Sequence, residues 1–371
     1  MNAHTLPEKL NITTAVTSFM GCLFQHPIAR EAFKDLCVSV GASSSPQILI
    51  FTGPTGVGKT TIAKALTNRL LKHYAEQMLA ERDFVPVVTV SAVPPSSAGF
   101  SWKDFHVRIL LGQSEPLVDR KYLMPYQVSL LPPHSLSSKS LDQSTADALR
   151  RSTEEYLRRR NTKLLIIDEA QHMLLVGGQQ RLGCQFECLK SLTIETGVTI
   201  LLVGTYRLLE ILDQSGQLTR RSQVINFPRY DMRKKDDRNH FKQVLKYFEL
   251  KLSEYLPTRL EDQADYFYTK SAGCIGILKD WLCRCLEYAF QEKLSCLDAD
   301  LAARFAHSNR GLVTIIEEAC LGEAKLADVD DARLTDLLAN GVLLRTGTSS
   351  VQGRYRPGRR NPMRDPVGVL V

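Results

Sequence analysis

The sequence predicts an α/β fold built on a five-stranded parallel sheet. Short runs rich in Ile, Leu and Val recur along the chain, and helical stretches separate them. The runs do not alternate between apolar and polar residues, as is expected of strands buried on both faces of a parallel sheet. With 371 residues, of which 44% are apolar and 23% charged, the chain is long enough to bury a large core.

The first 45 residues are expected to form an N-terminal helical segment. The stretch "QHPIAREAFKDL" at 25–36 has amphipathic spacing and places Pro27 near its first turn, where proline fits a helix. The polar stretch "GASSSPQ" follows and separates this segment from the first apolar run.

An α/β domain is expected at 46–231. The predicted strands are the apolar runs at 48–51, 86–90, 164–168, 199–204 and 223–227. The predicted helices between them include 60–78, a short helix at about 101–111, and 142–160. A loop rich in Pro and Ser precedes the last of these helices, and long loops in compact domains tend to carry a function.

Beyond residue 231 the pattern is helical. We expect a small helical bundle at 232–300, and further helices with a basic tail at 301–371. The tail carries six arginines and no acidic residue between Arg345 and Arg364, and Gly and Pro interrupt it. It either contacts DNA or a partner protein, or it is a disordered, solubilising end.

Composition and patterning exclude several classes of protein. No apolar run approaches the roughly 18 residues of a membrane-spanning helix, and "MNAHTLPEKLNITTAV" lacks the pattern of a signal peptide. We therefore expect no membrane partner and a cytoplasmic location. The spacing of Cys184 and Cys188 is not that of a zinc site, so the nine cysteines are expected to be reduced thiols.

The stretch "GPTGVGKT" fits the phosphate-binding loop pattern G-x-x-x-x-G-K-[ST], between a predicted strand and a predicted helix. Its glycines let backbone N–H groups turn toward phosphate oxygens, Lys59 supplies a positive charge, and the Thr60 hydroxyl fits Mg²⁺. We predict ATP and Mg²⁺ as cofactors. The predicted nucleotide-binding residues are Gly53, Pro54, Thr55, Gly56, Val57, Gly58, Lys59, Thr60 and Thr61.

A second motif, "LLIIDEAQH", places two acids at the end of a predicted strand. Asp168 is expected to hold Mg²⁺ with Thr60, and Glu169 to polarise the attacking water. Two adjacent acids at a strand end are costly to bury without a cation. The alternative is that they cap the next helix. A water-activating glutamate predicts an ATP hydrolase.

With these motifs the chain resembles the AAA+ ATPase superfamily from about residue 24 to residue 295. The resemblance implies an AAA+ P-loop domain followed by a helical lid, and it makes "QHPIAREAF" the segment that flanks the adenine. It also implies that Thr205 is a polar sensor beside the γ-phosphate and that Arg220 or Arg221 is an arginine finger. Lys279 is then the residue through which the lid contacts the nucleotide.

Each of these implied roles has a simpler alternative. Thr205 is otherwise an ordinary residue at a strand end. The two arginines are otherwise a solvated basic helix end, which the helix dipole favours. A finger that reaches a neighbouring subunit's nucleotide raises the rate of hydrolysis about 10³–10⁵-fold. A solvated helix end contributes nothing to that rate. The superfamily usually carries Arg where Lys279 stands, and a lone Lys on a lid helix is otherwise a solvated charge.

Within the superfamily the chain is similar to TnsC/TniB-type transposition ATPases. The similarity lies in "GPTGVGKTT", "PVVTVSAVPP", "LLIIDEAQHM" and "LLVGTYRLLEIL". It implies an ATP-dependent regulator of transposition that oligomerises on target DNA as a ring or helical filament and recruits or activates transposase. The implied partners are double-stranded DNA without sequence preference, transposase subunits, a target-selector protein and further copies of the chain.

The same resemblance places the helix and loop after the second strand against DNA. The cations expected to contact DNA phosphates are Lys103, Arg108, Lys121 and Arg151. Each of them is otherwise part of a solvated helix face. Trp102 and Phe105 either stack on a base or anchor the short helix.

Two rival functions remain. One is another AAA+ ATPase, either a replication initiator or helicase loader, or a secretion-system ATPase. An initiator should carry a winged-helix domain after the lid, for which 301–345 is short. The other is a nonenzymatic signalling NTPase that holds ADP as a latch, but such proteins usually lack the catalytic glutamate that Glu169 supplies here.

Overall fold

The computed structural model describes most of the chain in nine stretches. These are residues 6–22, 26–41, 48–94, 99–112, 146–175, 179–214, 222–256, 258–327 and 330–340. The chain divides into two compact units, Met1–Leu326 and Ala327–Val371. The first unit holds the sheet and the helical lobe that follows it.

The first unit contains the predicted five-stranded parallel sheet, which confirms the α/β fold class. Its strands are β1 (Ile48–Thr52), β2 (Val87–Ser91), β3 (Leu164–Asp168), β4 (Thr199–Gly204) and β5 (Ser222–Asn226). They lie in the order β2-β3-β4-β1-β5, and all neighbours are parallel. Thr52 is level with Gly204 and Asn226, so the carboxyl ends of these strands meet at one edge of the sheet.

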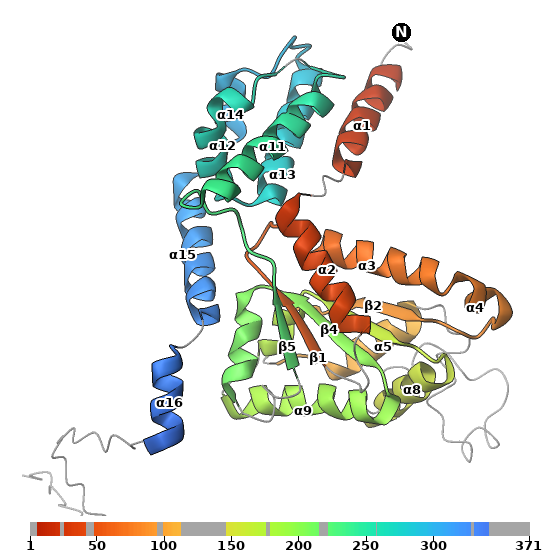
Figure 1. The fold of residues 1–371 in the computed structure, drawn as a ribbon. Helices are drawn as coiled ribbons and strands as arrows, with labels where there is room; N and C mark the ends of the chain where they lie inside the picture. The colour runs from red at the N-terminus through yellow and green to blue at the C-terminus, as the bar shows by residue number, and fades with distance from the viewer. Residues whose placement is uncertain are drawn as a thin grey trace, which may run out of the picture. The chain divides into compact units, whose positions relative to one another are not determined.

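Helices cover both faces of this sheet (Figure 1). On one face lie α2 (Pro27–Gly41) and α3 (Lys59–His73), and on the other α5 (Trp102–Gly112), α8 (Ala146–Arg159) and α9 (Gln179–Thr196). Successive strand residues point to opposite faces, so Leu49 and Phe51 join the core under α2 and α3. Ile48 and Ile50 join the core under the other three helices. Burial on both faces explains the uninterrupted apolar runs.

The helix predicted at 60–78 is divided in two. α3 ends at His73, Tyr74 lies between, and α4 spans Ala75–Ala80. Tyr74 has φ −96° and ψ 11°, outside the helical region, and its ring meets Phe84 edge-on at 5.4 Å. The break therefore coincides with an aromatic contact to the turn before β2.

A helical lobe follows β5 within the same unit. Its elements are α11 (Lys235–Leu252), η4 (Glu261–Gln263), α12 (Ala264–Ser271), α13 (Ile275–Gln291) and α14 (Ala299–Phe305). They enclose a separate apolar core around Trp281, Phe248 and Phe267. The N-terminal helix α1 (Leu6–Gly21) packs on this lobe, where Phe19 contacts Phe248 with ring centroids 5.5 Å apart.

The last helix of the first unit, α15 (Asn309–Leu326), returns toward the sheet and contacts η3 (Tyr206–Gln214), which follows β4. In the second unit the structure describes one helix, α16 (Asp331–Asn340). The predicted basic tail lies outside the described residues. Within the described residues, no helix is long and apolar enough to cross a membrane.

Candidate nucleotide-binding site

The loop between β1 and α3 is shaped to surround an anion. Gly56 and Gly58 adopt positive φ angles of 77° and 106°, a region of backbone conformation that favours glycine. α3 begins at the next residue, Lys59, so the loop leads directly into a helix N-terminus. A helix N-terminus carries free N–H groups and a partial positive charge. This arrangement is the one that binds phosphate groups.

The side chain of Lys59 contacts the first two residues of this loop. Its ammonium donates hydrogen bonds to the carbonyl oxygens of Gly53 at 2.9 Å and Pro54 at 2.7 Å. Burial lowers the pKa of Lys59 to about 8, although the nearby carboxylates of Glu169 and Asp168 raise it. A buried ammonium gains from an anionic ligand, because the opposite charge favours its protonated form.

The two predicted halves of a magnesium site meet. The Thr60 hydroxyl, in the first turn of α3, donates to Asp168 Oδ2 at the end of β3 with a length of 3.0 Å. Hydroxyl and carboxylate oxygens are ligands that Mg²⁺ prefers, and this ion usually takes its remaining ligands from water and phosphate. Among the described residues, no group of three or more His, Cys, Asp or Glu side chains could hold a metal ion. The Thr60 hydroxyl and the Asp168 carboxylate fit an ion that is shared with a bound nucleotide.

Glu169 has an unusual backbone. Its φ and ψ angles of 53° and 33° lie in the left-handed region, and its N–H donates to Asp168 Oδ1 at 2.9 Å. It precedes η2 (Ala170–Leu174), but its side chain makes no capping hydrogen bond there. The carboxylate is instead bonded to the amide of Gln171. The alternative in which Glu169 caps the next helix thus does not describe this structure.

Thr205 lies one residue beyond β4, near the acid pair. Its backbone N–H donates to Gln171 Oε1 at 3.2 Å. Its hydroxyl oxygen is buried and has no hydrogen-bond partner within the described structure. Buried polar groups are normally paired, so an unpaired hydroxyl at this position fits a ligand or water contact.

The segment predicted to flank the adenine contains a buried histidine, His26. His26 Nδ1 shares a hydrogen bond of 2.9 Å with the Tyr230 hydroxyl, and the His26 ring is stacked with Phe227 at a centroid distance of 6.1 Å. Burial, and secondarily His240, lower the pKa of His26 to about 4. A neutral imidazole therefore joins the start of α2 to the segment that links β5 with the helical lobe.

The helical lobe reaches the phosphate loop through the first turn of α13. The Gly276 N–H donates to the carbonyl oxygen of Gly56 at 2.7 Å. Lys279, the predicted lid contact, donates instead to the carbonyl oxygens of Met20, in the last turn of α1, and of Cys22, just after it, at 2.7 and 2.6 Å. Its ammonium would have to leave these two carbonyls to reach a nucleotide.

A hollow of about 210 Å³ opens between the phosphate loop and α15. Its lining includes Pro54 and Thr55 of the loop, Thr205 after β4, and Glu318 and Gly322 of α15. The periodicity of 301–345 predicts helices but does not indicate that one of them forms a wall of this site. α15 is thus the part of the site that the sequence analysis missed.

An ion pair links α15 to the segment just beyond β5. Arg229, just beyond β5, contacts both carboxylate oxygens of Glu323 at 2.9 and 3.2 Å. The two side chains are 14% and 29% exposed, so solvent screens the pair less than a surface pair. Burial lowers the pKa of Arg229, but the hydrogen bond to Glu323 and the charge of Glu323 together raise it above its ordinary value.

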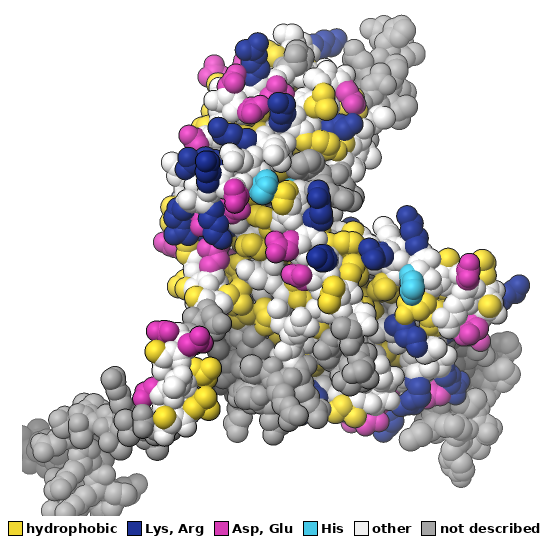
Figure 2. All heavy atoms as spheres, in the orientation of Figure 1, with side chains coloured by type: hydrophobic (Ala, Val, Ile, Leu, Met, Phe, Trp, Pro, Cys, Tyr) yellow, Lys and Arg dark blue, Asp and Glu magenta, His cyan; other side chains and the backbone are white. Residues whose placement is uncertain are grey.

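Of the cations predicted to contact DNA, three lie on two adjacent helices. Arg108 of α5 pairs with Asp104 at 2.6 Å, Lys103 of the same helix is half-buried, and Arg151 of α8 is exposed. Figure 2 shows Lys and Arg side chains interspersed with Asp and Glu side chains on one face of the molecule. Lys121 lies outside the described residues.

The two aromatic residues of α5 are anchors. Phe105 is buried in the core, and the Trp102 indole N–H donates to Gln185 of α9. The finger candidates Arg220 and Arg221 lie outside the described residues.

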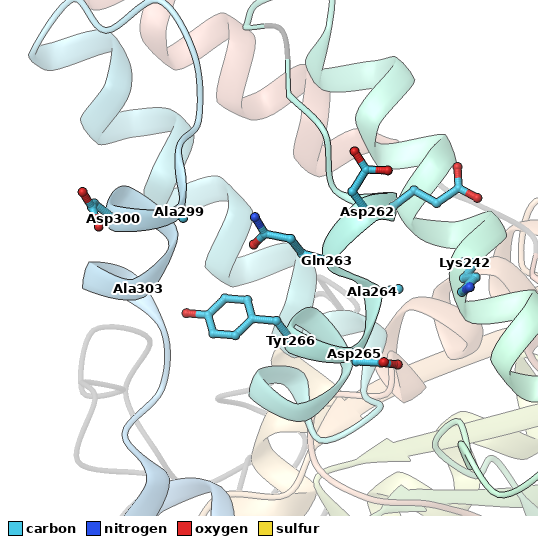
Figure 3. A pocket seen from close by; sticks show the side chains of 10 residues that line it. Lys242, Asp262, Gln263, Ala264, Asp265, Tyr266, Ala299, Asp300 and Ala303 are labelled. Carbon is cyan, nitrogen blue, oxygen red and sulfur yellow. The ribbon is translucent and has the colours of Figure 1, made fainter.

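A second hollow, of about 570 Å³, lies in the helical lobe (Figure 3). Its acidic side chains come from η4, α12 and α14, and they are Glu261, Asp262, Asp265 and Asp300. Lys242 of α11 stands at its edge. None of its described lining residues belongs to the phosphate loop or the acid pair, so it is separate from the nucleotide site.

Comparisons with known proteins agree with this geometry. Residues 42–212 match the family described as "AAA domain", and this range contains the phosphate loop and the acid pair. No curated protein matches the sequence.

Three solved structures illustrate the likeness of fold. The ORC2 protein of Aeropyrum pernix in its ADP form is 16% identical, with 75% of this chain and 65% of that chain covered and a TM-score of 0.48. Drosophila ORC bound to DNA is 12% identical, with 91% and 84% covered and a TM-score of 0.48. Domain III of the replication initiation protein DnaA from Thermotoga maritima is 13% identical, with 77% and 94% covered and a TM-score of 0.44. At such identities and TM-scores, the likeness carries no information about function.

Proposed function

We propose that this chain binds ATP with Mg²⁺, hydrolyses it, and uses the bound triphosphate to assemble on duplex DNA. The observation that carries the ATPase part is the contact between the Thr60 hydroxyl and Asp168, because it joins the phosphate loop to the acid pair at 3.0 Å. The start of α3 and the end of β3, which are distant in the sequence, thereby supply one ion site beside a loop that fits phosphates.

Each residue has a distinct role in the proposed hydrolysis. Lys59 leaves the two loop carbonyls and pairs with phosphate oxygens. Thr60 and Asp168 hold Mg²⁺, which when bound supplies positive charge against the phosphates. Glu169 accepts a proton from the attacking water, and the unpaired hydroxyl of Thr205 orients that water.

The proposal extends to a neighbouring copy of the chain and to DNA. Arg220 or Arg221 supplies an arginine finger to the nucleotide of the next subunit, as the resemblance to AAA+ proteins implies. Exposed Arg108 and Arg151, together with a net charge of +7, favour a polyanionic partner. Contacts of this kind give binding that is independent of DNA sequence and falls steeply with salt.

The process that the ATPase serves has two candidates. Regulation of transposition, with transposase and a target selector as partners, is supported by sequence resemblance alone. The alternative is an initiator or helicase loader, and the family match accords with it at least as well. The initiator-type alternative therefore has at least equal standing with the transposition regulator.

The ATPase proposal is tested by titrating fluorescent ATP with Mg²⁺ into three proteins, the natural chain, Lys59→Ala and Lys64→Ala. Lys64 is an exposed lysine on the same helix and serves as the matched control. We expect binding by the natural chain and Lys64→Ala, and none by Lys59→Ala. Equal binding by all three proteins would contradict the proposed site.

The two candidate processes predict different preferences for the sequence of the DNA duplex. A transposition regulator should assemble on any duplex in the presence of ATP and retain added transposase. An initiator should prefer one origin sequence over a scrambled duplex of equal length. Gel-shift titrations at fixed salt with both duplexes measure this ratio, since affinities at different salt concentrations are not comparable.

A further inference from the structure

One buried amide joins the proposed catalytic glutamate to the end of β4. Gln171 is only 8% exposed and lies in the first turn of η2. Its Nε2 donates to Glu169 Oε2, and its Oε1 accepts from the backbone N–H of Thr205 at 3.2 Å. The same side chain thus contacts the proposed base and the residue that carries the unpaired hydroxyl.

The two partners fix which way the amide points. A carboxylate only accepts hydrogen bonds, and a backbone N–H only donates them. Turning the amide over would place its NH₂ group against the N–H of Thr205 and its oxygen against the carboxylate of Glu169. Both contacts would then be repulsive, so Gln171 has a single satisfied orientation.

The close approach of this amide depends on a glycine at the end of β4. A Cβ atom at Gly204 would lie 2.3 Å from Gln171 Oε1 and 2.9 Å from Leu208 Cδ1. Real Cβ contacts do not reach such distances, so a side chain at Gly204 would push the amide away. The absence of a side chain at Gly204 therefore allows the Gln171 amide to reach from η2 to the end of β4.

We infer that Gln171 is a positioning residue for the proposed hydrolysis. It holds Oε2 of Glu169, which leaves Oε1 to accept the proton of the attacking water. Because Gln171 also accepts a hydrogen bond from Thr205, the orientation of the Glu169 carboxylate depends on the position of Thr205. A ligand that moves the end of β4 would therefore move the carboxylate as well. This inference rests on the proposed ATPase function, and Gln171 acts only through Glu169.

The test compares two variants. Gln171→Met keeps the length of the side chain and removes both hydrogen bonds. Gln171→Glu keeps an acceptor for the N–H of Thr205 and loses the donor to Glu169. Gln243→Met changes an exposed glutamine on α11 and is the matched control. Turnover, nucleotide affinity and melting temperature are measured for each protein.

We expect kcat to fall roughly 10- to 100-fold in both Gln171 variants, which is the size of effect that small misplacements of a catalytic group produce. Affinity for ATP should stay within about threefold, because no phosphate contact is lost. The Gln243 control should match the natural chain in all three measurements. A kcat for Gln171→Met equal to that of the natural chain would overturn the inference.

A double-substitution cycle separates positioning from a general structural role. In a Glu169→Gln background, single-turnover rates should be the same with and without Gln171→Met, because the group on which Gln171 acts is already gone. An equal further loss in both backgrounds would show that Gln171 is merely structural. If the natural chain itself binds or hydrolyses no ATP, the proposed function fails first; if it does and the cycle is additive, only the inference about Gln171 fails.

Discussion

Lys59→Met removes a buried charge from the phosphate loop while keeping most of the bulk of the side chain. In the free protein the ammonium is held by the carbonyl oxygens of Gly53 and Pro54. We expect the substitution to abolish nucleotide binding. We also expect it to change how the stability of the nucleotide-free protein depends on pH.

The size and sign of this change follow from the pKa of Lys59. Burial lowers it from 10.5 to about 8, and each pKa unit corresponds to about 1.4 kcal/mol, so keeping the charge in the folded state costs about 3 kcal/mol. Because the folded-state pKa lies below the unfolded one, the unfolded chain binds the proton more tightly. The cost is therefore fully present below about pH 8 and disappears as the pH rises toward 10.5.

The two lost hydrogen bonds act in the opposite direction, each by about 1 kcal/mol, but they change little with pH. At pH 7 the methionine variant should be as stable as the natural chain or about 1 kcal/mol more stable. By pH 10 the natural chain should have gained about 2 to 3 kcal/mol relative to the variant.

Urea unfolding at pH 7, 8.5 and 10, without nucleotide, measures this difference. Other groups titrate over the same range in both proteins, so the difference between the two free energies of unfolding isolates Lys59. Lys64→Met, on the exposed face of the same helix, should show no such dependence on pH. A difference that stays constant between pH 7 and pH 10 would refute the assignment of a desolvated ammonium in the loop.

Three further predictions concern the proposed base, the proposed arginine finger and the ion pair of α15. Glu169→Gln should lower turnover by about 10²–10⁴-fold and leave ATP bound, as shown by retained radiolabelled nucleotide after gel filtration; normal turnover would remove Glu169 as the base. Alanine at both Arg220 and Arg221 should abolish hydrolysis while leaving the ATP affinity of a single subunit intact; unchanged turnover would place the finger elsewhere. Arg229→Ala should leave the partly buried carboxylate of Glu323 unpaired, cost about 1–2 kcal/mol, and speed amide hydrogen exchange in α15 before that of the sheet; an exchange rate equal to that of an Arg310→Ala control would show that the ion pair does not hold α15.

The sheet and the phosphate loop were predictable because local sequence determines them. Strands buried on both faces need continuous apolar runs, and each observed strand lies within one residue of a predicted one. The loop needs glycine where φ is positive, and Gly56 and Gly58 stand at those positions. The meeting of Thr60 with Asp168 was predicted because both residues belong to motifs that hold the Mg²⁺ of a bound nucleotide.

The parts that were not predicted depend on contacts between residues far apart in the sequence. The periodicity of α15 identifies a helix, but its place at the site depends on contacts such as the pairing of Arg229 with Glu323. Lys279 lies on the predicted lid helix, yet the end of α1 captures its ammonium. Gln171 was assigned no role, because nothing in a single sequence indicates that its side-chain amide contacts Thr205.

The most direct test of a triphosphate-dependent assembly on DNA is sedimentation of the chain with a 60-base-pair duplex (about 200 Å long), in ATP, in ADP and without nucleotide. We expect a fast-sedimenting species that contains both protein and DNA in ATP alone, and its loss in Lys59→Ala. Protein that sediments as a single copy, apart from the duplex, under all three conditions would contradict the account.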